Sequence, residues 1–126
     1  MERLRKHHIS FRNAVSGLYW AFTSQPNFRI HFTLSLFVLF LGFMFQVTYV
    51  EMVLLVLTII FGLGIEMVNT SIEAMTDLIT TKWHQQAKIA KDVSAGMMLL
   101  TAVGAIFVAG LIFLPRFWSL LIHGIY

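Results

Sequence analysis

Polar side chains recur at helical spacing within a long apolar stretch of the sequence. Glu66, Thr70, Glu73 and Asp77 fall within about 60° of one another when residues follow at 100° intervals, and Asn69 lies just beside them. A carboxylate is costly to desolvate, so acids at membrane depth usually face a bundle interior or a wet cavity. This acidic stripe, residues 66–77, therefore predicts a functional site on one face of a helix.

Two carboxylates separated by two helical turns can divide the chemistry of a site. One can hold a hard divalent ion while the other accepts a proton. Magnesium is commonly shared between one or two carboxylates and the phosphates of a nucleotide, and Lys91, which follows the stripe after a polar turn, can supply a point charge for those phosphates. This combination favours phosphoryl transfer, in which positioning and charge stabilisation do nearly all of the catalysis.

The residues alone leave two other interpretations open. A proton- or cation-coupled transporter also needs acids at membrane depth, and a buried hydrogen-bond network can serve the fold alone. The sequence contains no G-x-x-x-x-G-K-[S/T] loop, and Gly62 and Gly64 are two glycines in an apolar helix that we expect to ease helix packing. Spacing alone therefore does not separate a kinase from a transporter.

The composition indicates a small integral membrane protein. Of the 126 residues, 58% are hydrophobic and only 12% are charged. This length is used up by about three membrane spans, so we expect one domain over residues 1–126 and no separate soluble catalytic domain. The absence of cysteine excludes thiol chemistry and thiolate metal sites.

The expected elements are all α-helical. Apolar residues three or four apart between positions 9 and 24 predict an interfacial helix over residues 1–25, which Pro26 ends. Transmembrane helices are expected over about 28–46, 51–79 and 88–114, the last closed by Pro115 and Arg116. Small residues along the third span are typical of a compact bundle or an oligomer, and equally of ordinary membrane helices.

Basic residues predict the orientation in the membrane. Five lysines and arginines precede the first long apolar run, and three lie between the second and third apolar runs. The connection over residues 46–50 has none. The positive-inside rule then places the N-terminus, the second loop and the acidic stripe at the cytoplasmic side. Anionic headgroups explain the basic arm better than nucleic acid, so we expect no nucleic-acid partner. His31, near the start of the first span, is expected to be an interfacial residue rather than a ligand.

Longer strings in the sequence resemble a known family. The string Glu66-Met-Val-Asn69-Thr-Ser-Ile-Glu73, then Asp77, then Ala87-Lys88-Ile-Ala-Lys91-Asp92-Val-Ser-Ala95-Gly96 is similar to the signature of the small prokaryotic diacylglycerol kinases. Ser10-Phe11-Arg12-Asn13-Ala14 and Asn27-Phe28-Arg29-Ile30-His31 resemble its Gram-positive branch, whose members are undecaprenol kinases. The resemblance covers nearly the whole chain.

The resemblance implies a homotrimer of three-span protomers with an N-terminal surface helix. Active sites would lie between subunits, on the cytoplasmic side of the bacterial cell membrane. The enzyme would depend on ATP and Mg²⁺ and would transfer the γ-phosphate of ATP to the hydroxyl of a membrane lipid alcohol. Undecaprenol is the expected substrate and diacylglycerol the alternative.

Matching positions imply individual roles. Glu66 is the expected general base on the lipid hydroxyl, Asn69 orients the site, and Glu73 is a magnesium ligand. The nucleotide is expected to contact a set of polar and aromatic side chains, namely Lys6, Asn13, Gln25, Glu73, Asp77, Lys82, Trp83, His84, Lys91 and Asp92. The lipid substrate is expected to contact Glu66, Arg29 and Ala95.

One position departs from the pattern of the family. Where the family commonly carries a glutamate that helps Glu73 hold the metal, this chain carries Gln25. A neutral amide is a poorer ligand for magnesium than a carboxylate, although its carbonyl oxygen can still bind. The expected second metal ligand is therefore weak.

Overall fold

The computed structural model describes the backbone of residues 2–123 and the side chains of residues 9–122. It contains four helices, α1 (Glu2–Ser24), α2 (Pro26–Met44), α3 (Tyr49–Ile79) and α4 (Gln85–His123). The described residues form no strand, which confirms the expected all-α fold. By length and composition α2, α3 and α4 can each cross a membrane, so the three predicted spans are also confirmed.

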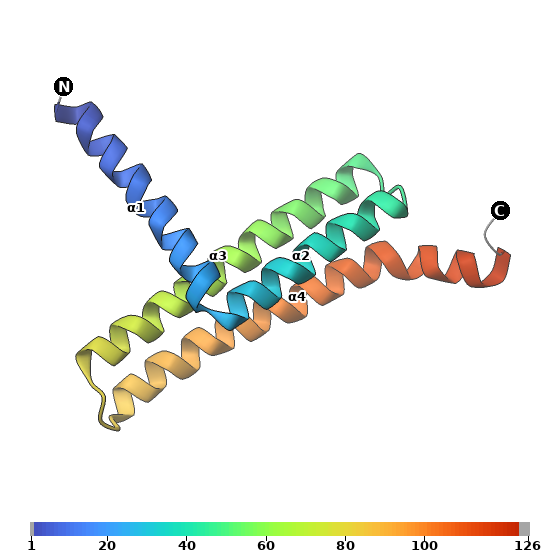
Figure 1. The fold of residues 1–126 in the computed structure, drawn as a ribbon. Helices are drawn as coiled ribbons and strands as arrows, with labels where there is room; N and C mark the ends of the chain where they lie inside the picture. The colour runs from blue at the N-terminus through green and yellow to red at the C-terminus, as the bar shows by residue number, and fades with distance from the viewer. Residues whose placement is uncertain (1, 124–126) are drawn as a thin grey trace.

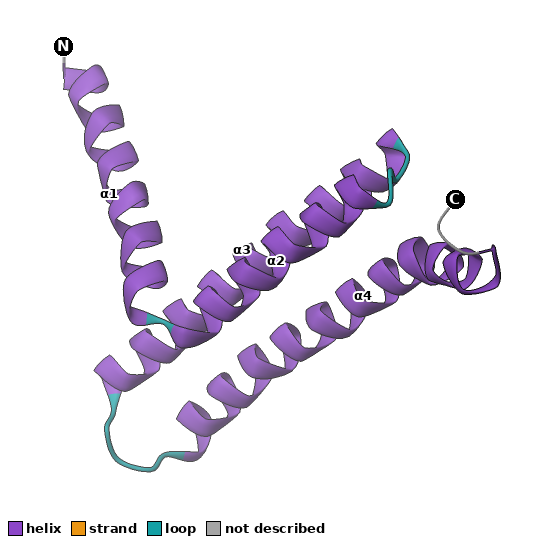
Figure 2. Ribbon diagram, turned by 45° about the vertical axis from the view of Figure 1, so that its right-hand side comes forward, coloured by secondary structure: helices purple, strands orange, loops and turns teal. Residues whose placement is uncertain are grey.

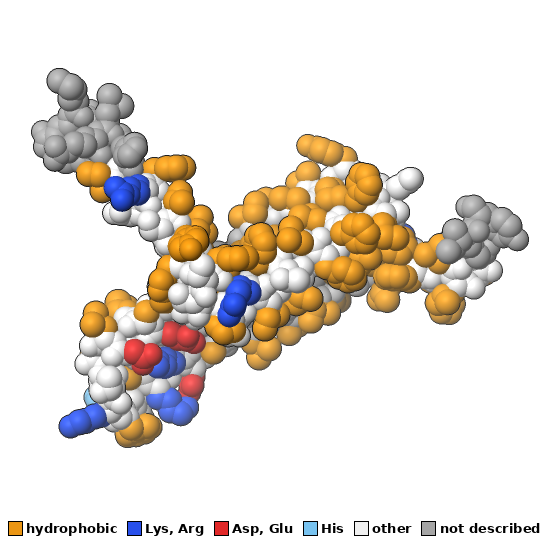
Figure 3. All heavy atoms as spheres, viewed as in Figure 1, with side chains coloured by type: hydrophobic (Ala, Val, Ile, Leu, Met, Phe, Trp, Pro, Cys, Tyr) orange, Lys and Arg blue, Asp and Glu red, His pale blue; other side chains and the backbone are white. Residues whose placement is uncertain are grey.

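Helix α3 is the centre of the bundle. It packs along both α2 and α4, whereas α1 contacts α2 and projects from the bundle at an angle (Figures 1 and 2). The buried apolar core is small and consists of Leu55, Ile112 and Phe113. Most other large apolar side chains are exposed, and Figure 3 shows them covering the visible face of the bundle. Such a surface suits contact with lipid or with further protein.

A tight turn makes α2 and α3 antiparallel neighbours. Gln46 adopts a left-handed conformation with φ 49°. Thr48 then caps α3 in a reciprocal box, because its backbone N–H donates to Glu51 Oε2 at 2.7 Å and its hydroxyl accepts from the Glu51 amide at 3.4 Å. A Cβ on Gly42 would lie 3.0 Å from Met52 Cε, so a larger residue there would require the flexible end of Met52 to shift by a few tenths of an ångström.

The same end of α3 is joined to α4 by a bidentate ion pair. Arg116 Nη1 and Nη2 donate to the two carboxylate oxygens of Glu51 at 3.0 and 2.6 Å. Phe45 from the turn packs edge-on against Phe113 and Phe117 of α4, with ring centroids 6.0 and 4.8 Å apart. The end of the bundle that contains the turn between α2 and α3 is therefore stabilised by both an ion pair and aromatic contacts.

Helix α4 does not end where we expected. It continues through Pro115 to His123, and Figure 1 shows its last turns bending away from the bundle. Membrane helices tolerate an internal proline where side chains replace the lost backbone hydrogen bonds. Pro115 has no N–H to donate to the carbonyl of Leu111, and the neighbouring Arg116 Nη1 donates to the carbonyl of Ile112 at 2.5 Å. The first membrane helix also ends earlier than expected, at Met44 rather than residue 46.

Candidate active site

The acidic stripe lies on the inner face of α3. Glu66 is 2% exposed, Asn69 5% and Thr70 8%, and these are among the most buried polar residues described. Glu73 is half-buried and Asp77 is exposed. The acidic side chains of the stripe therefore become more exposed toward the loop between α3 and α4. Glu66 lies in a buried environment and Asp77 in an exposed one.

The buried end of the stripe has unused hydrogen-bonding capacity. Asn69 Nδ2 donates to Glu73 Oε1 at 3.2 Å, but Asn69 Oδ1 is buried with no partner in the described chain. No hydrogen bond joins the Glu66 carboxylate to any described residue. The side chains that act on it electrostatically are His31 of α2 and Glu73. Buried polar groups without partners are rare and need an explanation, which a bound ligand would supply.

The exposed end of the stripe opens into a polar pocket. Asp77 Oδ1 accepts a hydrogen bond from Lys91 Nζ at 2.5 Å, which joins α3 to the start of α4, and Lys88 pairs with Asp92 one turn along. Figure 3 shows acidic and basic side chains gathered at the end of the bundle near the α3–α4 loop, with further basic side chains near the middle of the bundle and on α1. The pocket has a volume of about 270 Å³ and includes six of the predicted nucleotide contacts, Asp77, Lys82, Trp83, His84, Lys91 and Asp92.

Other predicted residues lie apart from this pocket. Gln25 is the N-cap of α2 and makes no side-chain capping bond, and no hydrogen bond joins it to Glu73 in the described chain. Asn13 on α1, Arg29 on α2 and Ala95 on α4 are exposed and do not line the pocket. Lys6 lies in α1, but its side chain is outside the described residues. One protomer thus assembles only part of the expected site.

The donor set near Glu73 suits magnesium. Its carboxylate and the unpartnered Asn69 Oδ1 are hard oxygen donors, which magnesium prefers. The described residues contain no group of three or more His, Cys, Asp or Glu side chains able to hold a metal. Such a sparse set fits an ion that keeps several waters and takes further oxygens from phosphates.

Comparison with known proteins decides between the interpretations that the residues left open. The family model for prokaryotic diacylglycerol kinase matches residues 12–113. The chain belongs to this family. The protein is therefore a membrane lipid kinase, an enzyme that phosphorylates an alcohol.

Curated relatives carry two names within the prokaryotic diacylglycerol kinase family. A diacylglycerol kinase of Synechocystis sp. is 36% identical over 115 residues, which cover 90% of this chain and 66% of the relative. An undecaprenol kinase of Bacillus subtilis is 35% identical over 113 residues, which cover 90% of this chain and 92% of the relative. A diacylglycerol kinase of Helicobacter pylori is 30% identical over 110 residues, covering 87% and 79%.

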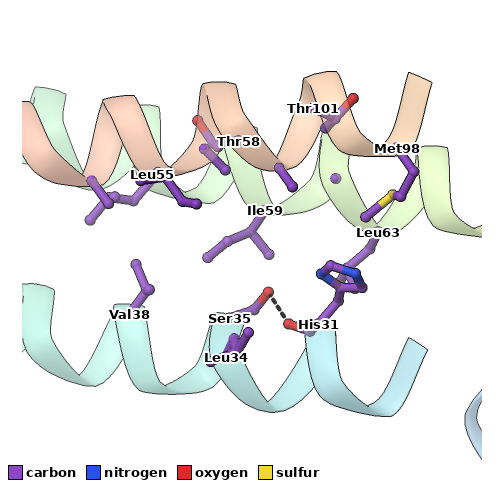
Figure 4. A pocket seen from close by; sticks show the side chains of 15 residues that line it. His31, Leu34, Ser35, Val38, Leu55, Thr58, Ile59, Leu63, Met98 and Thr101 are labelled. Atoms are coloured by element: carbon purple, nitrogen blue, oxygen red, sulfur yellow. Dashed lines mark hydrogen bonds between the residues drawn. The ribbon is translucent and has the colours of Figure 1, made fainter. Parts of the chain in front are cut away.

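The structure places His31, which the sequence predicts to be a membrane-interface residue, between packed helices. His31 is half-buried and lines one end of an apolar groove between α2, α3 and α4 (Figure 4). This location could not be predicted, because His31 is far from the acidic stripe in sequence and only the packing of α2 on α3 determines its neighbours. The one sequence signal was its place at the end of the Asn27-to-His31 string that resembles the prokaryotic diacylglycerol kinase family.

Proposed function

We propose that this lipid kinase transfers the γ-phosphate of ATP to the hydroxyl of undecaprenol at the cytoplasmic membrane surface. The observation that carries the proposal is the pairing of a buried, unpartnered acid, Glu66, with a polar pocket at the other end of the same stripe. The extent of the match favours undecaprenol, because it covers 92% of the undecaprenol kinase but 66% of the Synechocystis diacylglycerol kinase. Diacylglycerol is the second candidate.

In this proposal Glu66 acts as the general base. Its carboxylate sits in a membrane helix with no hydrogen-bond partner among described residues, so it is free to accept the proton of a lipid hydroxyl. Asn69 orients the neighbouring acid, since its amide donates to Glu73. A lipid alcohol reaches such a base from within the bilayer, with Arg29 and Ala95 as further proposed contacts.

Glu73 and Asn69 Oδ1 are the proposed magnesium ligands, with Gln25 as a weak third. When bound with ATP, magnesium neutralises charge on the phosphates during transfer. Glu73 is held by Asn69 at 3.2 Å, which fixes one carboxylate oxygen and leaves the other for the metal. The ligand set is thus positioned by α3 alone, apart from Gln25.

The loop pocket is the proposed nucleotide site. Lys91 and Lys82 supply positive charge for phosphate oxygens, and the exposed Trp83 offers an aromatic face for the base. Asp77 holds Lys91 in place at 2.5 Å. Because Asn13, Gln25 and Arg29 lie apart from the pocket, we propose that a neighbouring copy in a homotrimer completes the site.

A phosphorylation assay with matched variants tests the proposal. Purified protein in micelles receives labelled ATP with undecaprenol or diacylglycerol in parallel, and wild type is expected to form undecaprenyl phosphate faster. Glu66→Gln should lower the rate at least about 10²-fold, as for loss of a general base, while ATP and magnesium binding persist. Ser71→Ala, at an exposed position of the same helix where the hydroxyl bonds the Met67 carbonyl, is the matched control.

The outcomes separate the parts of the proposal. Faster formation of phosphatidic acid would assign diacylglycerol as the substrate. A folded wild-type protein that forms neither product would contradict the proposed reaction. Normal activity in Glu66→Gln would exclude this residue as the base.

A further inference from the structure

Helix α4 is longer than one membrane crossing requires. It has 39 residues, and at about 1.5 Å per residue it extends about 58 Å, whereas the hydrocarbon of a bilayer is about 30 Å thick. The stretch between Asp92 and Arg116 carries no charged residue, and its length of about 35 Å is enough to cross that hydrocarbon. Arg116 therefore marks the membrane boundary opposite to the loop pocket, and residues 116–122, the terminal segment, lie beyond the crossing.

The terminal segment leaves the bundle in a fixed direction. Figures 1 and 2 show that the last turns of α4 change direction and bend away from the bundle, as expected where a helix contains an internal proline. Both guanidinium nitrogens of Arg116 bind Glu51 of α3, and the ring of Phe117 packs on Phe45 with 4.8 Å between centroids. The start of the segment is thus attached to the bundle, and its further turns extend from it.

An exposed apolar stripe runs along α4 and continues past the bend. Its residues recur at intervals of three or four and therefore share one face of the helix, namely Phe107, Leu111, Leu114, Trp118 and Leu121. Each of these side chains is 64–81% exposed. The first three belong to the uncharged stretch that can cross a membrane. The terminal segment therefore extends an apolar surface that begins within the crossing.

The polar residues of the terminal segment lie on its other side. At 100° per residue Arg116 and Ser119 are within about 60° of each other, and Trp118 and Leu121 are within about 60° on the opposite side. Because Arg116 reaches Glu51 of α3, the apolar side faces away from the bundle. The bend away from the bundle then turns this apolar side toward the membrane around it.

We propose that the terminal segment lies along the membrane surface opposite to the loop pocket, as an interfacial anchor with Trp118 and Leu121 against the phospholipid acyl chains. Tryptophan is enriched at this level of a membrane, and interfacial helices lie with their apolar side about 5–10 Å into the boundary between headgroups and acyl chains. Because Arg116 joins the segment to Glu51, the anchor also fixes the height of α3 in the membrane. This role is separate from the proposed kinase reaction.

A second copy of the chain is a poorer partner for this apolar side. The terminal segment is about 10 Å long and about 10 Å wide, so one side of it offers roughly 100 Å². A stable protein interface buries about 800 Å² on each partner. A phospholipid surface has no such minimum, and it surrounds the membrane-crossing part of the same helix.

Spin labels on single cysteines test the position of the terminal segment. The natural chain contains no cysteine, so Leu121→Cys and Ser119→Cys each provide one labelling site, at exposed positions on opposite sides of the segment. In phosphatidylcholine vesicles the label at position 121 should collide more with oxygen, which concentrates in hydrocarbon, and the label at position 119 more with a water-soluble nickel chelate. The ratio of oxygen to nickel collisions should be at least about threefold higher at position 121, because the apolar side lies about 5–10 Å deep.

The other outcomes of the labelling experiment would overturn the anchor. Equal ratios that favour nickel would place the terminal segment in water, and equal ratios that favour oxygen would place all of it within the hydrocarbon. A label at position 121 that meets neither reagent, with spectra that sharpen when unlabelled protein is added, would assign the apolar side to a second copy. The measurement uses no kinase activity, so its result is independent of the proposed reaction.

Discussion

Glu66 and Glu73 are two carboxylates on one helix whose surroundings differ. Glu66 is 2% exposed and unpartnered among the described residues, while Glu73 is half-buried and held by Asn69. A desolvated carboxylate is suited to taking a proton, and a partly solvated one to holding a hydrated cation. Burial alone thus supports the two separate roles that we propose for them.

Replacing Gln25 tests the departure from the family pattern. Gln25→Glu should lower the magnesium concentration needed for half-maximal activity, because a carboxylate is a better ligand than an amide. Magnesium titrations of the kinase rate measure this, with Gln25→Ala as the matched control. An unchanged titration in Gln25→Glu would count against a place for residue 25 at the metal.

Asn69 offers a test that separates stability from activity. Its buried Oδ1 lacks a partner in the described chain, which costs about 1–3 kcal/mol in the absence of ligand. Asn69→Leu should therefore leave the Tm unchanged or higher, while the kinase rate falls and the magnesium requirement rises. Thermal unfolding and magnesium titration of the same preparation check both parts. A large fall in Tm would indicate that the asparagine serves mainly the fold.

Helix α3 is joined to α4 by an ion pair at each end, and the two pairs differ in kind. Asp77–Lys91 is a single contact with side chains 62% and 38% exposed, whereas Glu51–Arg116 is bidentate with side chains 26% and 24% exposed. Exposed pairs contribute about 1 kcal/mol or less, while bidentate arginine pairs are stronger and more specific in geometry. The Glu51–Arg116 pair therefore contributes more to the fold, and the weaker Asp77–Lys91 pair is consistent with the nucleotide site that we propose.

Matched substitutions distinguish the two ends of α3. Arg116→Met should lower the Tm by several degrees, because it removes both bonds to Glu51 and the bond to the Ile112 carbonyl. Lys91→Met should change the Tm little and raise the KM for ATP. Thermal unfolding and steady-state kinetics measure the two effects. The reverse pattern would contradict this assignment.

The helices could be predicted from the sequence because their signals are local. Apolar length predicted the three spans, and the spacing of Glu66 to Asp77 predicted a common face, which the structure places inward at its buried end. The ion pair of Arg116 with Glu51, 65 positions away, could not be predicted, because it depends on how α4 packs on α3. His31 was missed for the same reason: its place beside Glu66 depends on how α2 packs on α3.

At the scale of the whole molecule, one copy of the chain does not bring all of the predicted contacts together. Predicted contacts on α1 and α2 lie apart from the loop pocket, and most large apolar side chains are exposed. Lipid can cover part of that surface, but it cannot bring the missing polar groups to the pocket. Both observations support the proposed homotrimer, with sites shared between subunits.

Subunit mixing tests shared sites directly. Arg29→Ala and Glu66→Gln should each be nearly inactive alone, but co-assembled subunits should regain activity, since some sites then take both intact residues from different copies. Rates before and after co-assembly, with light scattering in detergent to count three copies per particle, measure this. Failure of mixed trimers to regain activity would place both residues in one protomer's site.

The burial of Glu66 inside a membrane-spanning helix has a consequence for how such an enzyme senses its substrate. In its proposed role as general base, Glu66 would meet only molecules dissolved in the bilayer, so the relevant concentration would be a mole fraction in two dimensions. Adding inert phospholipid would then slow the reaction even though the total amount of lipid alcohol stays constant. In the cell, the rate of turnover would fall as other lipids dilute the lipid alcohol in the membrane around the protein.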